Sequence, residues 1–219
     1  MKGKFHSSGG LGTALLALLV ILPCLANGQL PPPPVPPPLG DSEALSQVMG
    51  DFFRVPVPLI KELEGSVPIP SLNLPVVLFI AHHSHVSPHL LVTWRREGRT
   101  WLEIAGRLKL PPTIFFLPLP EGRLGPPYGR AYGYYWKHKK DKKVPIILSD
   151  EEIADLVQLK ICTSYFGLPP RQIISLRSNG VRFSQIYGQE YRKRHGPAGG
   201  EFMAEVESRK RVDLWPAAG

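Results

Sequence analysis

Residues 82–106 read HHSHVSPHLLVTWRREGRTWLEIAG, and they align without a gap with residues 164–188, SYFGLPPRQIISLRSNGVRFSQIYG, at an offset of 82 positions. Prolines, glycines and large apolar residues recur at the same places in both stretches. The matched pairs are Pro88 and Pro170, Arg95 and Arg177, Gly98 and Gly180, Trp101 and Phe183, Ile104 and Ile186, and Gly106 and Gly188. Self-similarity at a set spacing is the signature of a duplicated structural unit. We therefore expect two related units in one chain.

Each unit is expected to contain three short helices, because helix-capping residues recur around both stretches. In the first unit the expected helices span residues 76–84, 88–97 and 101–108. Asn73 is a candidate N-cap for the first of them, with Pro75 in its first turn. Thr100 and Glu103 form a capping box before the third, and Gly98 is expected to end the second in a left-handed conformation.

The second unit repeats this pattern, with helices expected over residues 150–166, 171–179 and 183–191. Ser149 and Glu152 form a capping box, and the acidic first turn suits the positive end of the helix dipole. Gly167 and the prolines after it indicate a turn. The matched residues Trp94, Trp101, Leu176 and Phe183 are expected to be buried in equivalent ways. The fold class that follows is mainly α, with two three-helix repeats joined by an insertion.

The first two helices of each unit resemble a helix-turn-helix, whose pattern has a small residue, then a turn glycine, then an aliphatic residue. The matching residues are Thr163, Gly167 and Ile173 in the second unit, and Ala81, His85 and Leu91 in the first. A small residue lets the helices approach, and glycine adopts the left-handed turn most readily. His85 departs from the pattern because it replaces the glycine. The resemblance implies the hairpin shape more strongly than DNA binding.

The arrangement is also similar to a group of uncharacterised bacterial exported proteins. The shared motifs are the loop Gly125-Pro126-Pro127-Tyr128-Gly129, the turn Leu176-Arg177-Ser178-Asn179-Gly180, and the aromatic Phe183. The similarity covers roughly residues 72–193. It implies an exported location and a type of fold, and it implies no activity.

The first 28 residues are typical of a secretory signal peptide. Lys2 and Lys4 form the positive start, residues 11–22 form an apolar run, and Ala26-Asn27-Gly28 provides small residues for cleavage near Gln29. The apolar run is shorter than the roughly 20 residues that a membrane span needs, which disfavours the alternative of an uncleaved anchor. We expect the mature protein to be periplasmic or extracellular.

The chain after the signal peptide divides by composition into five segments. Residues 29–41 are a proline-rich linker, 42–108 a helix plus the first unit, 109–148 a basic aromatic insertion, 149–194 the second unit, and 195–219 a flexible tail. The linker sequence LPPPPVPPPL favours an extended polyproline II conformation. Residues 42–53 are amphipathic and are expected to pack on the first unit. The tail could contain a helix over residues 201–211.

The composition and motifs exclude several classes of protein. Hydrophobic residues make up 43% of the 219, enough to bury a core, so wholesale disorder is excluded. Two cysteines rule out a disulfide framework, and no zinc-finger spacing is present. The chain has no nucleotide-binding loop, no GxSxG and no HExxH. We therefore expect no catalytic residues, no cofactor and no enzymatic activity.

The insertion 109–148 is the candidate binding region because it combines basic and aromatic residues. The candidate binding residues are Arg130, Tyr134, Tyr135, Trp136, Lys137, Lys139, Lys140, Lys142 and Lys143. Basic groups attract phosphate or uronate polymers, and aromatic rings supply stacking. The alternative is a solvated loop whose aromatic residues pack on the domain. The apolar runs 114–117 and 144–148 could pair as a short β-ribbon, with Pro145 confining the second to an edge.

Two other groups of residues could bind a ligand. His82, His85 and His89 crowd one corner and could hold a transition metal, but no carboxylate or thiolate adjoins them, so we expect no metal site. The second helix of the second unit is expected to expose Arg171 and Gln172, which are residue types that read bases. An exported protein does not meet the chromosome, which argues against that use.

The function expected from these features is that of an exported, non-enzymatic binding or scaffold module of the cell envelope. Its basic aromatic loop would contact an envelope protein or an anionic polymer. One alternative is a nucleic-acid-binding helix-turn-helix protein, and another is a small envelope enzyme of unknown chemistry. No transmembrane span is expected to remain after cleavage of the signal peptide.

Overall fold

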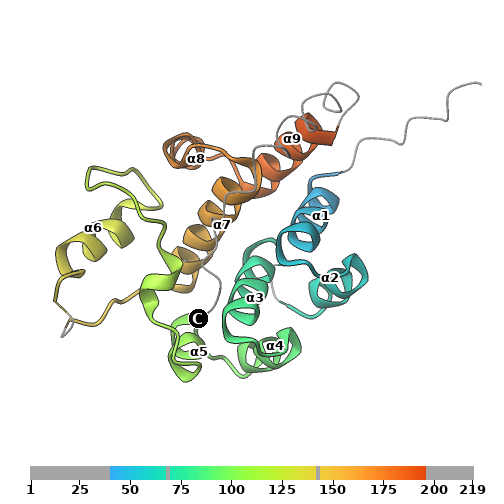
Figure 1. Cartoon of the computed structure of the whole chain (residues 1–219), viewed down its shortest axis with the longest axis horizontal. Helices are drawn as coiled ribbons and strands as arrows, with labels where there is room; N and C mark the ends of the chain where they lie inside the picture. Colours follow the sequence, from blue (N-terminus) through green and yellow to red (C-terminus); the bar gives the residue numbers. More distant parts are fainter. Residues whose placement is uncertain (1–39, 68–69, 142–143, 196–219) are drawn as a thin grey trace, which may run out of the picture. The chain divides into compact units, whose positions relative to one another are not determined.

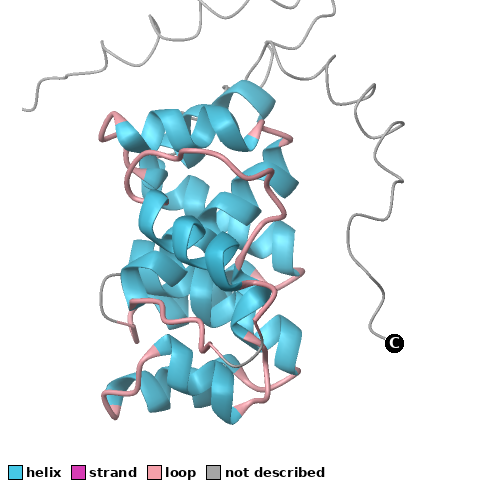
Figure 2. Ribbon diagram, turned by 90° about the vertical axis from the view of Figure 1, so that its left-hand side faces the viewer, coloured by secondary structure: helices cyan, strands magenta, loops and turns pink. Residues whose placement is uncertain are grey.

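The computed structural model describes residues 40–67, 70–141 and 144–195, and within these ranges the chain is helical with no β-strand (Figure 1). Figure 2 shows the same residues as helices joined by loops. The prediction of a mainly α fold is therefore confirmed. The predicted signal peptide, nearly all of the proline-rich linker, Lys142, Lys143 and the predicted tail helix lie outside the described residues.

Helix α7 forms the centre of the described residues. The α-helices are α1 (Asp41–Phe53), α2 (Val57–Glu64), α3 (Pro70–Ser84), α4 (Pro88–Arg96), α5 (Trp101–Arg107), α6 (Gly129–His138), α7 (Asp150–Phe166), α8 (Pro170–Ser178) and α9 (Phe183–His195). α7 packs against α1, α3, α5, α8 and α9. Its residues from Glu152 to Cys162 are all buried except Lys160. Figure 1 shows α7 between α8 and α3, which agrees with the burial of this helix on most of its sides.

Most helix boundaries agree with the capping residues in the sequence. α4, α5, α7 and α8 begin and end within one residue of the predicted positions. The Thr100 hydroxyl accepts from the Glu103 N–H, and Ser149 does the same for Glu152, which confirms both capping boxes. α9 continues to His195, beyond the predicted end at residue 191.

The turn residues that close the helices have left-handed backbones. Gly98 and Gly180 have φ angles of +83° and +82°, so both predicted terminators are confirmed. Gly167, after α7, has φ +73°, and His85, at the matching place after α3, has φ +56°. The chain therefore adopts the same turn at both places, although only one has the glycine that tolerates it readily.

Helix α3 begins earlier than predicted. It starts at Pro70, so Pro75 lies inside the helix and Asn73 is not its N-cap. Asn73 is instead buried, and its Oδ1 accepts a hydrogen bond from Trp101 Nε1 at 3.2 Å. Pro75 lacks the N–H of an intrahelical bond, but the surrounding apolar residues of α3 are buried and stabilise the helix through packing.

Helix α1 confirms the predicted amphipathic helix, and it packs on the first unit as expected but more extensively on the second. Ala44, Leu45, Val48 and Met49 are buried along one face. That face packs most extensively on α9, in the second half of the chain, and also contacts α2 and α3. The Asp41 carboxylate of α1 occupies the space beside Gly188, so a residue with a Cβ at this position would displace that side chain. α1 therefore joins the two halves rather than packing on the first alone.

The insertion contains helices where a β-ribbon was considered. Residues Pro112–Phe115 form a short 3-10 helix, and residues 144–148 form a loop. Leu117, at the end of the first run, donates its N–H to Tyr132 Oη at 3.1 Å, and its carbonyl accepts from that hydroxyl at 2.9 Å. The tyrosine thus satisfies the backbone groups that a partner strand would have used. The ribbon is absent from the described residues.

Burial of the four matched large residues differs between positions. Trp101 and Phe183 are buried, as predicted. Trp94 and Leu176 match each other but are only partly buried at the edge of the core, so the expectation that they are buried is wrong. Both lie on the second helix of their half, which presents one side to solvent.

Candidate functional site

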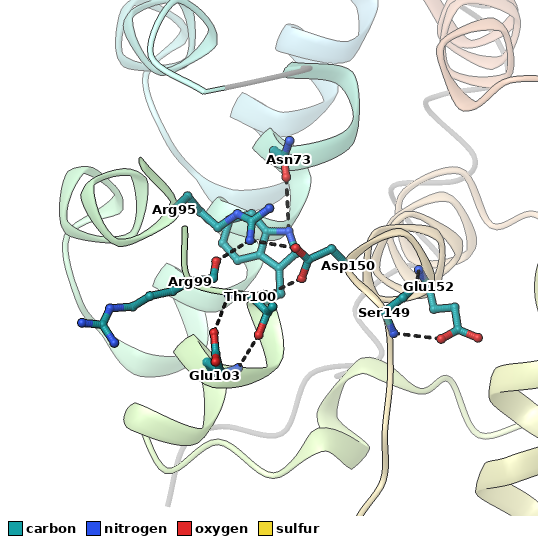
Figure 3. Close-up of polar contacts among 9 residues, drawn as sticks. Asn73, Arg95, Arg99, Thr100, Glu103, Ser149, Asp150 and Glu152 are labelled. Carbon is teal, nitrogen blue, oxygen red and sulfur yellow. Dashed lines mark hydrogen bonds and ion pairs between the residues drawn. The ribbon is translucent and has the colours of Figure 1, made fainter. Parts of the chain in front are cut away.

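Asp150, in the first turn of α7, connects α7 to the short helices α4 and α5 (Figure 3). Its Oδ2 pairs with the Arg95 guanidinium at 2.8 Å, and its Oδ1 accepts from the Trp101 backbone N–H at 2.7 Å. The Arg95 guanidinium also lies 4.5 Å from the centre of the Trp101 ring. These contacts, with the bond between Trp101 and Asn73, hold α4 and α5 against α3 and α7.

Arg177 makes similar contacts at the end of α8. One amino group donates to Asp155 Oδ1 at 2.9 Å, and the other donates to the Val181 carbonyl at 2.9 Å. Its guanidinium lies 4.6 Å from the centre of the Phe183 ring. Charge-assisted hydrogen bonds of this kind stabilise a half-buried guanidinium. We call each arginine, with the acid and the aromatic ring that it contacts, an arginine clamp: Arg95 with Asp150 and Trp101, and Arg177 with Asp155 and Phe183. Both clamps have a structural role, because the charge of each guanidinium is paired within the fold.

Helix α6 turns its aromatic residues inward. The Tyr135 ring stacks on Phe116 with centres 4.3 Å apart, and the Trp136 ring lies 5.3 Å from that of Tyr132. Both pack against the core. Tyr135 and Trp136, two of the predicted binding residues, are therefore partly used in packing. This agrees with the alternative of a solvated loop whose aromatic residues pack on the domain.

The opposite face of α6 carries the basic residues. Arg130 is 72% exposed and forms a two-pronged ion pair with Glu152, with nitrogen–oxygen distances of 2.8 and 2.6 Å. Lys139 pairs with Glu121 at 2.8 Å. Lys137 and Lys140 are exposed and make no polar contact with other described residues. Arg130 and Lys137, about two turns apart, therefore lie on one exposed basic face of α6, and the exposed Lys140 follows the end of the helix.

Tyr134 lies at the border of this face. Its hydroxyl donates to the Pro145 carbonyl at 3.0 Å, and its ring lies 4.5 Å from that of His138. Gly133 is beside it, and the space that a Cβ would occupy there is open. A ligand on the basic face could therefore approach the α6 backbone closely at Gly133.

The histidines near the end of α3 do not form a metal centre. His83 Nδ1 lies 2.8 Å from the Phe79 carbonyl, and His89 Nε2 lies 3.9 Å from Glu62 Oε1. Burial lowers the pKa of His82 and of His83, and nearby His85 lowers that of His82 further. Within the described ranges, no three His, Cys, Asp or Glu side chains are placed to hold a metal ion. His82, His85 and His89 therefore do not converge.

Two groups on α7 have strongly shifted protonation. Lys160 Nζ donates to the Ile114 carbonyl at 2.6 Å and lies 5.3 Å from the centre of the Phe79 ring. Burial lowers the pKa of Lys160 to about 8. Burial raises the pKa of the Cys162 thiol to about 12. Cys162 is thus protonated at neutral pH and acts as a small core residue.

The second helices of the two halves differ in what they leave exposed. On α4, Arg96 donates to the Ser66 carbonyl at 3.2 Å, so the α2 side of the molecule occupies part of this surface. On α8, Arg171, Gln172 and Ser175 are exposed and make no polar side-chain contact with described residues. Among the described residues, therefore, only α8 exposes the predicted base-contacting residues without polar contacts to other side chains.

Helix α6 was missed by the sequence analysis, which treated residues 109–148 as a loop. A signal was present: Tyr132 follows Tyr128 by four positions, and Tyr135 and Trp136 follow Tyr132 by three and four, which are helical intervals. Glycine at positions 129 and 133 and the high β-propensity of tyrosine obscured it. Packing of this aromatic stripe on the core overrides the weak helix propensity.

No protein-family model, curated protein or solved structure matches the chain. In the part of the chain that the structure describes, no helix combines the length and the apolar character needed to cross a membrane. Functional inference therefore depends on the contacts within the chain itself.

Proposed function

We propose that this chain is an exported, non-enzymatic binding module of the cell envelope that attracts an anionic polymer or acidic protein through the basic face of α6. The observation that carries the proposal is the division of α6 into two faces. Tyr132, Tyr135 and Trp136 anchor one face in the core, and the other carries exposed cations. In the sequence, residues 137–143 contain five lysines and one aspartate.

The scaffold of this module is proposed to be a pair of helix-turn-helix-like three-helix repeats. Supporting this, Gly98 and Gly180 have nearly the same φ angle, and the turns at His85 and Gly167 are both left-handed. Position 73 in the first repeat matches position 155 in the second. Each is occupied by an acceptor, Asn73 or Asp155, that binds another helix of its own repeat.

Export is proposed from the sequence of residues 1–28, which has the order of a signal peptide. Cleavage near Gln29 would leave the proline-rich linker as a spacer ahead of α1. N-terminal sequencing of protein recovered from the cell envelope tests this step. Recovery of cytosolic protein that begins at Met1 would contradict it.

The binding proposal is tested by comparing two double variants of the full chain. Lys137→Ser/Lys140→Ser removes two exposed cations, one on α6 and one just after its end, and Arg171→Ser/Arg182→Ser removes two exposed cations from the α8 region. Each phosphate contact contributes about −0.9 to the slope of log K against log salt. We expect the α6 variant to bind heparin more weakly than wild type, with a slope reduced by about 2.

The Arg171→Ser/Arg182→Ser variant is the matched control, because it removes the same charge. It is expected to retain heparin binding within about threefold, corresponding to less than 1 kcal/mol. Equal losses of heparin affinity in both variants would indicate a general effect of net charge and would contradict the assignment of the binding surface to α6. Thermal melting of all three proteins checks that the substitutions leave the fold intact.

A second candidate is nucleic-acid binding through α8, favoured by the exposed, uncommitted Arg171 and Gln172 at the start of that helix. Such residues at the start of a recognition helix contact base edges. The same pair of variants distinguishes the candidates with duplex DNA as the ligand. Loss of DNA binding only in the Arg171→Ser/Arg182→Ser variant would favour this reading.

A further inference from the structure

A cleft of about 680 Å³ opens between α5 and the segment that follows α6. Leu102, Gly106 and Leu110, from α5 and the residues after it, line one part of the cleft. Residues 111–113 and 144–146 line the rest, together with the end of α6. The volume is within the roughly 300–1,000 Å³ typical of small-molecule sites.

The surface of the cleft is mainly aliphatic. Its lining contains two leucines, three prolines, a valine and an isoleucine. Leu102, Leu110 and Ile146 pack against the core but remain partly exposed. A ligand that covered these side chains would remove apolar surface from water, which favours binding.

The backbone of the lining is constrained. Pro111, Pro112 and Pro145 have φ angles that are fixed by their rings. The Tyr134 hydroxyl donates to the Pro145 carbonyl at 3.0 Å, which ties this part of the lining to α6. A ligand would therefore lose little affinity through the ordering of these segments.

Gly106 provides open space on the α5 side of the cleft. It is exposed, and no atom lies within 4 Å of the position that a Cβ would occupy. Leu102 lies about one turn earlier on the same side of α5. An apolar molecule can therefore lie along Leu102 and across Gly106.

The charged groups that line the cleft are already paired or engaged. Lys139 and Asp141 are the only lysine, arginine or acid in the lining, and their formal charges cancel. The Lys139 ammonium pairs with Glu121 at 2.8 Å, and Asp141 is also engaged within the chain. An ion of either sign would lose hydration in the cleft without gaining an unpaired counter-charge, so an uncharged ligand is favoured.

Thr113 supplies an uncharged polar group to the lining. It is exposed, and its hydroxyl makes no polar contact with the described residues. A hydroxyl can both donate and accept a hydrogen bond. A few polar groups of this kind orient a ligand in a mainly apolar site.

We propose that this cleft binds a small uncharged molecule with an apolar body and a hydroxyl or carbonyl group. The apolar body lies along Leu102, Gly106 and Ile146, and the polar group bonds to the Thr113 hydroxyl. None of these four residues belongs to the basic face of α6. The proposal can therefore fail or succeed independently of polymer binding.

The probes are octan-1-ol, octanoate and octylammonium, which share one alkyl chain and end in a neutral, a negative and a positive group at pH 7. Each is titrated into the full chain, within its solubility and below its micellar concentration, and followed by calorimetry. We expect saturable binding of octan-1-ol, with an affinity about tenfold above that of either ion, because only the ions lose charge hydration in the cleft.

Two substitutions test where the ligand lies. Gly106→Phe fills the cleft and is expected to weaken octan-1-ol binding by about tenfold or more. Thr113→Val keeps the shape of the side chain and removes its hydroxyl, which should weaken binding by about fivefold, the effect of one neutral hydrogen bond.

Gly133→Phe is the matched control for Gly106→Phe. Gly133 is also a helical glycine with open space at its Cβ position, but it does not line the cleft, so this variant is expected to bind octan-1-ol like wild type. Absence of saturable octan-1-ol binding, an equal affinity for either ion, or unchanged binding in Gly106→Phe would each overturn the proposal. Unchanged binding in Thr113→Val would overturn the assignment of the ligand's polar group to Thr113.

Discussion

The segment α3–α5 and the segment α7–α9 use the same arginine clamp but obtain its counter-charge differently. In α7–α9, Arg177 pairs with Asp155 of the same segment, with a nitrogen–oxygen distance of 2.9 Å. In α3–α5, the position that matches Asp155 is Asn73, which is uncharged. Arg95 pairs instead with Asp150, the first residue of α7, at 2.8 Å.

This difference makes the first segment depend on the second. Asp150 neutralises Arg95 and also accepts from the Trp101 N–H, one of the N-terminal donors of α5 that have no intrahelical partner. The second segment contains its own acid and does not need the first for this purpose. The first segment thus takes its counter-charge from α7, whereas the second supplies its own.

The largest expected effect comes from removing the aromatic residue under each clamp. Trp101→Ala and Phe183→Ala each empty a buried site, at a cost of about 3–5 kcal/mol in the free energy of unfolding. Trp101→Ala should be the more severe, because it also leaves the buried Asn73 without this bond. Urea denaturation followed by circular dichroism measures both.

Trp94→Ala serves as the control for these variants, because Trp94 is only partly buried and its ring contacts the Arg107 guanidinium. It should cost about 1–2 kcal/mol. If Trp101→Ala were no more destabilising than Trp94→Ala, the view of Trp101 as the centre of the first clamp would be wrong.

Replacing the acid of each ion pair with asparagine tests directly how much each segment depends on its counter-charge. Asp155→Asn leaves Arg177 without a counter-charge in a mostly buried site, and we expect a loss of about 2–3 kcal/mol. Asp150→Asn should cost about 1–2 kcal/mol, because the Asp150 carboxylate is more exposed to water than that of Asp155. Chemical denaturation at pH 7 gives both values.

Adding Asn73→Asp to the Asp150→Asn variant should recover part of its loss, since it restores an acid at the position that Asp155 occupies in the other segment. A double-mutant cycle over Asn73→Asp and Asp150→Asn isolates the coupling. A coupling energy of zero would show that the two segments do not use this position in the same way.

The local features of both segments could be predicted from sequence, because caps and turn glycines act within a few residues. Ser149 with Glu152 and Thr100 with Glu103 identify helix starts by themselves. The role of Asn73 could not be predicted in this way, since its partner Trp101 is 28 residues away. The clamp acids also depend on tertiary packing, which no local pattern encodes.

The candidate site was predicted only in part for the same reason. The charge of residues 130–140 is visible in the sequence, and it does form an exposed face on α6. Helix periodicity explains why Tyr134 lies at the surface while Tyr135 packs on Phe116 at the core. The glycines concealed this periodicity in the sequence.

A smaller effect is expected where α7 meets the first segment through Lys160. The matching position in the first segment is the buried Leu78. Burial lowers the pKa of Lys160 to about 8, whereas an exposed lysine titrates near 10.5. Between these values the unfolded chain binds more protons than the folded chain, so the contribution of Lys160 to stability rises as pH rises.

Raising the pH from 7 to 9.5 should therefore increase the free energy of unfolding of wild type, relative to Lys160→Met, by about 2 kcal/mol. Methionine keeps most of the apolar stem and removes the titrating amine. Urea denaturation of both proteins at pH 7, 8 and 9.5 measures the difference. Parallel pH profiles would show that Lys160 is hydrated in the folded protein and does not contribute to the contact between the segments in this way.

The smallest expected effect concerns the two left-handed turns, where His85 with φ +56° corresponds to Gly167 with φ +73°. Residues with a Cβ pay roughly 1–2 kcal/mol in this conformation, and glycine pays only its larger entropy loss on folding. Gly167→Ala is therefore expected to cost about 1 kcal/mol. His85→Gly should stabilise the chain by about 0.5 kcal/mol, the strain relieved less the entropy lost. Differential thermal melting resolves these shifts when the two variants and wild type are scanned together. If both substitutions destabilised the chain equally, side-chain contacts of His85 would outweigh its backbone strain, and the two turns would be alike in shape but not in energetics.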